Sequence, residues 1–211
     1  LATAYIHGAA DYPVLTCAKH FPGHGDTATD SHWELPVINH DRARLESIEL
    51  PPFQAAIRAG VDSIMSAHLM IPALDPELPA TLSQRILTEE LRQKLGFEGL
   101  ISTDALVMGA IADRYGKHEA PVMSVAAGSD MILMPVDPEI AIQAVCAAVN
   151  SGRISAERIK ASVGRIWRSK QKLFKDWDGV TLTQSPVNSQ PATLTTLAQP
   201  ESMAVADHML Q

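Results

Sequence analysis

Short apolar runs alternate with amphipathic segments over most of this chain. Four apolar runs have strand length, and each begins or ends near a glycine, a proline or a polar cluster; they are residues 14–18, 61–67, 99–103 and 130–134. The segments between them have helical periodicity: Leu87, Leu91 and Leu95 recur at i, i+4 and i+8 and would line one face of a helix over residues 83–95. The pattern therefore predicts strand followed by helix, repeated four times.

Start and stop signals support the predicted helices. Asp41, Ser83 and Ser155 stand where side-chain oxygens cap helix N-termini, and Gly60 and Gly96 stand where helices end. Further helices are predicted over residues 121–127, 137–150 and 155–174.

Strands that alternate with helices are typically parallel, because each helix crosses back over the sheet to start the next strand. We therefore predict an α/β protein. Four such units are half of a (β/α)₈ barrel. From residue 176 to 211 Thr, Ser, Pro, Gln and Asn dominate, which predicts a linker or the start of another domain after a domain at residues 1–175.

Composition narrows the choice of partner. The chain is 46% hydrophobic, enough for a core, and its formal charge of −7 disfavours nucleic acid and anionic membranes. No apolar run reaches the roughly 18 residues of a membrane span. The chain opens on Leu1, so we expect a missing N-terminal part; cytoplasm is the expected compartment, and a secreted or periplasmic location stays open. Cys17 and Cys146 lie in apolar runs and are predicted to be buried free thiols.

Candidate chemistry gathers where the predicted strands end. Residues 19–32 (KHFPGHGDTATDSH) hold three histidines, one lysine (Lys19) and two aspartates, and Asp30 and His32 are among them. A carboxylate two residues from an imidazole can fix its tautomer and leave the second ring nitrogen free for proton exchange. His68 and Asp104 follow the second and third strands, which is where barrel enzymes place their sites.

The KHFPGHGDTATDSH stretch resembles the signature of glycoside hydrolase family 3, in its bacterial β-N-acetylhexosaminidase branch. Residues 99–111 (GLISTDALVMGAI) resemble the strand that carries the nucleophile in that family. The resemblance implies that Asp104 is the nucleophile, that Asp30 and His32 supply the acid/base, and that Lys19 and His20 bind sugar hydroxyls. It also implies that the four strands are the later half of the family's barrel, so that the arginine and aspartate from the earlier half are absent.

Each of these residues has a plainer alternative role. An aspartate after a strand can cap the following turn, and a histidine between polar residues is often a surface residue. Lys19 could form an ion pair at the strand end, and His20 could be a core histidine. His24 could order its loop or approach the substrate. His68 could be a core residue or a wall of the site.

A zinc site is disfavoured. His20 and His24 have ligand spacing, but Pro22 and Gly23 between them prevent the helical face that presents such a pair, and no cysteine joins them. No metal or other cofactor is predicted.

The sequence therefore predicts a retaining glycosidase that removes terminal β-linked N-acetylglucosamine, with cell-wall fragments as the expected carbohydrate substrate. A β-glucosidase and a phosphorylase of the same family are alternatives within the enzyme class. An alternative outside it is an inactive fragment, or a half-barrel that pairs with another chain. For residues 1–211 alone we predict self-association and little activity, with Leu15, Ile64, Ile101 and Ile132 lacking the opposite side of a barrel core.

Overall fold

In a computed structural model the structure describes residues 1–27 and 35–173. Four parallel strands form one sheet in the order β1-β2-β3-β4, namely β1 (Cys17–Phe21), β2 (Ser63–Ser66), β3 (Leu100–Ala105) and β4 (Met131–Leu133). Consecutive strands are neighbours, as expected when a helical crossover joins each pair in the same direction. The predicted α/β class and the four strand–helix units are confirmed. The predicted boundary at residue 175 and the tail at 176–211 stay predictions, because that tail lies outside the described residues.

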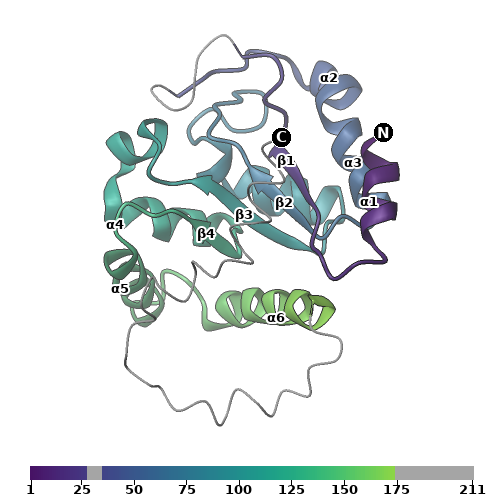
Figure 1. Cartoon of the computed structure of the whole chain (residues 1–211). Coiled ribbons are helices and arrows are strands. Elements are labelled where there is room, and N and C mark those ends of the chain that lie inside the picture. The colour runs from purple at the N-terminus through teal and green to yellow at the C-terminus, as the bar shows by residue number, and fades with distance from the viewer. Residues whose placement is uncertain (28–34, 174–211) are drawn as a thin grey trace, which may run out of the picture. The chain divides into compact units, whose positions relative to one another are not determined.

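Helices surround the sheet in Figure 1, with α1 and α3 beside β1 and with α4 and α5 near β4. In chain order they are α1 (Ala2–Ala9), α2 (Arg42–Arg44), η1 (Leu45–Glu49), α3 (Leu50–Arg58), η2 (Ala80–Leu82), η3 (Arg85–Lys94), α4 (Gly109–Ala127), α5 (Pro138–Asn150) and α6 (Ala156–Leu173).

The predicted helix starts are occupied by capping side chains. Asp41 accepts a hydrogen bond from Arg44 N at 2.8 Å, Ser83 accepts from Ile86 N at 3.2 Å, and Ser155 accepts from Arg158 N at 3.1 Å. Each bond satisfies one of the backbone donors that a helix start leaves without an intrahelical partner. The local sequence therefore sets where these helices begin.

Several boundaries differ from the sequence prediction, and one of them concerns Asp104: β3 runs to Ala105, so Asp104 lies within the strand and not after it. β1 begins at Cys17, where pairing with Ser63 of β2 begins, so Lys19 and His20 lie within the strand and not after it. α4 begins at Gly109, twelve residues before the predicted start, and Gly116 (φ +71°) kinks it where a regular helix would otherwise run on.

The main core lies between the sheet and its helices. Phe21, Ile64 and Ile101 are fully buried there, and the helices contribute Phe53 and Leu91 among others. The prediction that Ile64 and Ile101 would lack an opposing core is therefore wrong, because alternation along the strands points both side chains at the helix layer. Leu15 and Ile132 are partly buried.

The free cysteines Cys17 and Cys146 are exposed, contrary to the prediction. Cys17 lies on edge strand β1 beside an open groove, and Cys146 lies beside a second groove between α5 and α6. An apolar neighbourhood in the sequence does not fix which side of an element a residue occupies.

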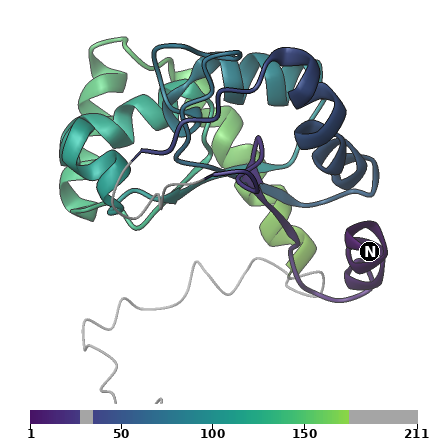
Figure 2. The same ribbon diagram turned by 90° about the horizontal axis from the view of Figure 1, so that it is seen from above.

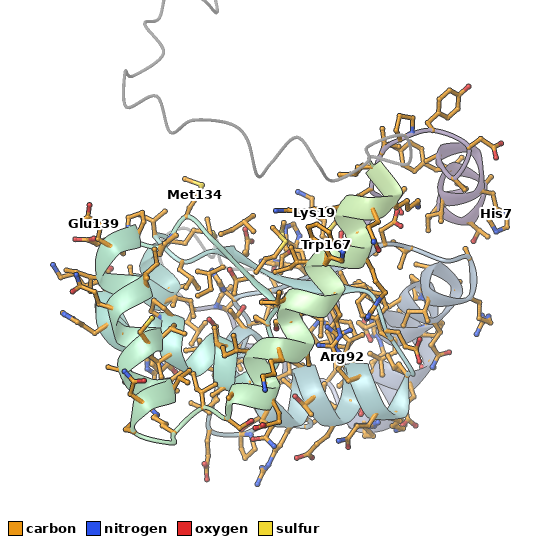
Figure 3. The ribbon with its side chains drawn as sticks, turned by 90° about the horizontal axis from the view of Figure 1, so that it is seen from below. His7, Lys19, Arg92, Met134, Glu139 and Trp167 are labelled. Carbon is orange, nitrogen blue, oxygen red and sulfur yellow. The ribbon has the colours of Figure 1, made fainter. Side chains whose placement is uncertain are left out.

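Helix α6 lies across the end of the sheet at which the strands begin (Figure 2, Figure 3). The Asp130 carboxylate, just before β4, is fully buried and accepts hydrogen bonds from Ser162 Oγ at 2.6 Å and Arg165 Nη1 at 3.1 Å. Farther along the helix, Lys172 Nζ donates to Asp62 Oδ1, just before β2, at 2.6 Å. These bonds hold α6 from β4 to β2, so it closes the end of the sheet opposite the predicted site.

Within the described residues, no helix is both long enough and apolar enough to span a membrane.

Candidate active site

His20 of β1 and Asp104 of β3 meet at the carboxyl ends of the strands. His20 Nε2 lies 3.5 Å from Asp104 Oδ2, and the two side chains are 26% and 21% exposed. Asp104 Oδ1 accepts a hydrogen bond from Ala105 N at 2.8 Å. One carboxylate oxygen is thus held by the backbone, while the other faces an imidazole and remains reachable from outside.

Asp104 does not cap the following helix. The N-cap of α4 is Met108, and no side chain caps that helix start. Asp104 therefore takes no part in starting α4, and its carboxylate stays at the strand end.

Burial lowers the pKa of His20, the carboxylate of Asp104 opposes that shift, and the nearby Lys19 and His24 add to it. His20 is therefore neutral at neutral pH and can donate one hydrogen bond and accept another. Such a group suits a sugar hydroxyl, which also both donates and accepts. Lys19, the preceding residue in β1, is exposed.

His24 lies next to His20. Their rings are 6.0 Å apart between centroids in an edge-to-face arrangement, and Thr27 Oγ1 lies 3.0 Å from His24 Nδ1. Gly23 bends the chain between them with a φ of +136° and donates its N–H to His20 O at 2.9 Å. Both alternatives for His24 therefore remain compatible with its position, since it packs within the loop and also borders the site.

Asp26, which follows His24, contacts residues for which the sequence analysis predicted no role. Asp26 Oδ2 lies 2.8 Å from His40 Nε2 and 3.6 Å from Arg44 Nη2, and Arg44 also pairs with Glu49. No local pattern identifies this cluster, because Asp26 and His40 are 14 positions apart. Asp30 and His32, the predicted acid/base pair, lie outside the described residues and stay predictions.

His68 is 1% exposed, and both of its ring nitrogens contact protein groups. Nδ1 lies 2.9 Å from Thr81 Oγ1 and Nε2 lies 3.0 Å from Ala105 O. A side chain so enclosed cannot reach a sugar, so the structure favours the core alternative for His68 over the predicted substrate contact.

A groove of about 860 Å³ borders the site along the outer edge of β1. Lys19, His20 and His24 line its polar end, while Tyr5 of α1 and Phe53 of α3 are among the residues of its apolar part. Among the described residues, no group of three His, Cys, Asp or Glu side chains is arranged to hold a metal ion.

Comparison with known proteins bears on the family to which this chain belongs. The model described as "Glycosyl hydrolase family 3 N terminal domain" matches residues 1–169. Beta-hexosaminidase A of Pseudoalteromonas piscicida is 36% identical over 197 residues, which cover 83% of this chain and 33% of that protein. The solved structure of a family 3 β-N-acetylglucosaminidase from Paenibacillus sp. str. FPU-7 is 44% identical with a TM-score of 0.80, covering 90% of this chain and 36% of that one.

A β-glucoside phosphorylase bound to 2FGlc is also similar, with 30% identity and a TM-score of 0.78 over 83% of this chain and 34% of that one. The chain spans about a third to about half of the length of curated relatives that it matches. Its four parallel strands accordingly correspond to part of a barrel domain. With the family model matching most of the chain and the predicted nucleophile strand in place beside His20, this chain belongs to glycosyl hydrolase family 3.

Proposed function

We propose that this chain supplies the catalytic half of a retaining glycoside hydrolase that removes terminal β-linked N-acetylglucosamine, with cell-wall fragments as its natural substrates. The observation that carries the proposal is the Asp104 carboxylate, with Oδ1 held by Ala105 N–H and Oδ2 accessible beside His20. Family membership and relatives named beta-hexosaminidase support it.

Retention of configuration requires two displacements. In the first, an Asp104 oxygen forms a bond to the anomeric carbon as the glycosidic bond breaks, and His32 gives its proton to the departing oxygen. In the second, His32 takes a proton from water, the water oxygen attacks the same carbon, and the Asp104 ester bond breaks. Asp30 would hold the His32 ring and stabilise its charged form.

Lys19, His20 and His24 would bind the sugar. The neutral His20 offers both a donor and an acceptor, and Lys19 offers an ammonium group from the same strand. The distance of 3.5 Å between His20 Nε2 and Asp104 Oδ2 supports this role, because groups so close together would contact one sugar ring beside the attacking oxygen.

The remaining barrel would come from a segment that pairs with the outer strands. Within the described residues, β1 and β4 each pair on one side only. Large apolar side chains near β4 are exposed, including Met134 at 65% and Ile142 at 65%. Strand edges and apolar surface of this kind favour association, so residues 1–211 alone should self-associate and turn over slowly.

The nucleophile is tested in the complete gene product. Asp104→Ala should abolish cleavage of an aryl N-acetylglucosaminide, and a 2-fluoro sugar should label Asp104 covalently, as peptide mass spectrometry would detect. Asp113→Ala, an exposed carboxylate on α4, is the matched control and should retain activity. Labelling of another carboxylate would overturn the assignment.

The acid/base pair is tested by leaving-group dependence. His32→Ala should slow substrates with poor leaving groups far more than activated aryl substrates, because only the former need a proton on the departing oxygen. Asp30→Asn should act in the same direction but less severely. An equal loss on both substrate types would instead assign the segment to binding.

Phosphorolysis is the second candidate function, favoured by the similarity to a β-glucoside phosphorylase. A histidine acid/base repels phosphate less than a carboxylate would. Formation of a sugar 1-phosphate when inorganic phosphate is added would favour this reaction over hydrolysis, and faster cleavage of aryl glucosides than of aryl N-acetylglucosaminides would favour a β-glucosidase.

A further inference from the structure

The backbone pairing between β2 and β3 stops before β3 reaches the end that carries Asp104. The last paired residues are Met65 and Ser102, while β3 runs on to Ala105. Beyond that point the side chain of His68 reaches Ala105 O, with a distance of 3.0 Å from Nε2. An imidazole thus makes the contact that a further backbone hydrogen bond between the strands would otherwise make.

The partners of His68 assign its hydrogens. A carbonyl oxygen only accepts, so Nε2 carries a proton and donates to Ala105 O. Burial lowers the pKa of His68, so Nδ1 is unprotonated at neutral pH. It lies 2.9 Å from Thr81 Oγ1, whose single hydrogen can be donated either to Nδ1 or to Ala67 O, also 2.9 Å away. Ser66 Oγ lies 2.9 Å from Thr81 Oγ1 and can donate to it. All three side chains are at most 1% exposed, so water does not compete for these bonds.

The peptide group that His68 binds is also held from its other side. Leu106 N donates to Leu133 O of β4 at 3.0 Å, while Ala105 O of the same peptide group accepts from His68. This peptide group is therefore fixed between the ends of β2 and β4. The adjoining Ala105 N–H is the group that donates to Asp104 Oδ1 at 2.8 Å.

We propose that His68 is a positioning residue for the nucleophile: by fixing the Ala105 carbonyl it keeps the Ala105 N–H aimed at Asp104 Oδ1, which leaves Oδ2 directed at the substrate. This inference rests on the proposed role of Asp104. His68 acts through the backbone and does not touch the sugar.

The hydrogen bond from His68 Nε2 to Ala105 O can persist when the His68 ring is protonated. Thr81 Oγ1 also lies 2.9 Å from Ala67 O, so its hydroxyl can turn to that carbonyl and accept from Nδ1–H when His68 is charged. Nε2 keeps its proton in both states. The titratable groups that act on His68 are Asp104, which favours the charged form, and His20 and His24, which oppose it. The hold on Ala105 should therefore not itself shape the pH profile of the reaction.

Two substitutions of His68 distinguish the roles of its two ring nitrogens. The amide nitrogen of His68→Gln reaches the position of Nε2 and can donate to Ala105 O, whereas that of His68→Asn reaches only the position of Nδ1. In the complete gene product, kcat for an activated aryl N-acetylglucosaminide should fall by roughly tenfold or more in the Asn variant and by less than about threefold in the Gln variant, because small displacements of reacting groups carry large rate penalties. KM should change little in either, and the rate of 2-fluoro sugar labelling should follow kcat.

Folding and the proposed function are checked separately. Circular dichroism melting identifies a variant that fails to fold, and histidine ¹⁵N NMR of the unmodified protein should show His68 protonated at Nε2 alone at neutral pH. Equal kcat losses in folded Gln and Asn variants, a rise in KM alone, or a His68 ring without a proton on Nε2 would overturn the proposal. If the unmodified protein shows no glycosidase activity, the proposed function fails, whereas the NMR result still tests the hydrogen-bond assignment.

Discussion

The buried carboxylate of Asp130 should be the most sensitive electrostatic position in the described structure. It is 0% exposed, and besides Ser162 and Arg165 it accepts from Ile101 N at 3.0 Å and from Arg92 of η3. Burial lowers the pKa of Arg92 to about 10, so this guanidinium is still charged at neutral pH. Replacing Asp130 by Asn keeps the size of the side chain, removes the charge and replaces one acceptor oxygen by an NH₂ group that donates.

The expected loss of stability follows from the burial of this ion pair. Removing one member of a buried ion pair costs about 3–5 kcal/mol, because the remaining charge is left without compensation. For a domain of about 150–250 residues 1 kcal/mol corresponds to roughly 2–4 °C, so the midpoint of the transition that unfolds this domain should fall by about 6–20 °C.

Differential scanning calorimetry of the complete gene product measures this shift, with limited proteolysis reporting cleavage within α6. The matched control is Glu119→Gln. Glu119 pairs with Arg153 on the surface, where the two side chains are 45% and 49% exposed, and such pairs contribute about 0–1 kcal/mol. If Asp130→Asn shifted the midpoint no more than Glu119→Gln, the buried carboxylate would not be what holds α6 against the sheet.

Three further outcomes are expected. Gly99→Ala should destabilise the fold in calorimetry, because its Cβ would lie 2.4 Å from Asp62 O, whereas Gly8→Ala in α1 meets nothing within 4 Å and should be neutral or stabilising. Stability should fall as the pH drops below 6.5, because the unfolded chain then binds a proton at His68 that the buried ring resists, and His68→Gln should flatten that part of the melting curve against pH. Residues 1–211 should elute as self-associated species in gel filtration with little hexosaminidase activity; a monodisperse monomer with normal turnover would refute the half-barrel interpretation.

The sequence alone was sufficient for the class of fold and for most helix starts. Capping depends on residues three positions apart, as at Asp41 and Ser155, and strand or helix periodicity depends on nearest neighbours. The order of strand, helix and strand then limits the topology to a parallel sheet, which predicts that His20 and Asp104 meet at one end of it.

The sequence could not show what depends on contacts between distant positions. His68 and Ala105 are 37 positions apart, and Asp26 and His40 are 14 apart, so no local pattern distinguishes these histidines from substrate ligands or surface residues. The exposure of Cys17 likewise depended on which side of β1 faces the open groove.

The sequence by itself therefore determined the strand–helix repeat, the family and the reactive side chains available at the strand ends. Each of these depends on residues that are close together along the chain. What only the tertiary structure decided is how those groups are held. Asp104 Oδ1 is held by the Ala105 N–H, and Ala105 is fixed by His68, which follows β2, and through Leu106 by β4. Such an arrangement exists only after three strands have paired, since burial and hydrogen-bond direction are properties of the packed chain.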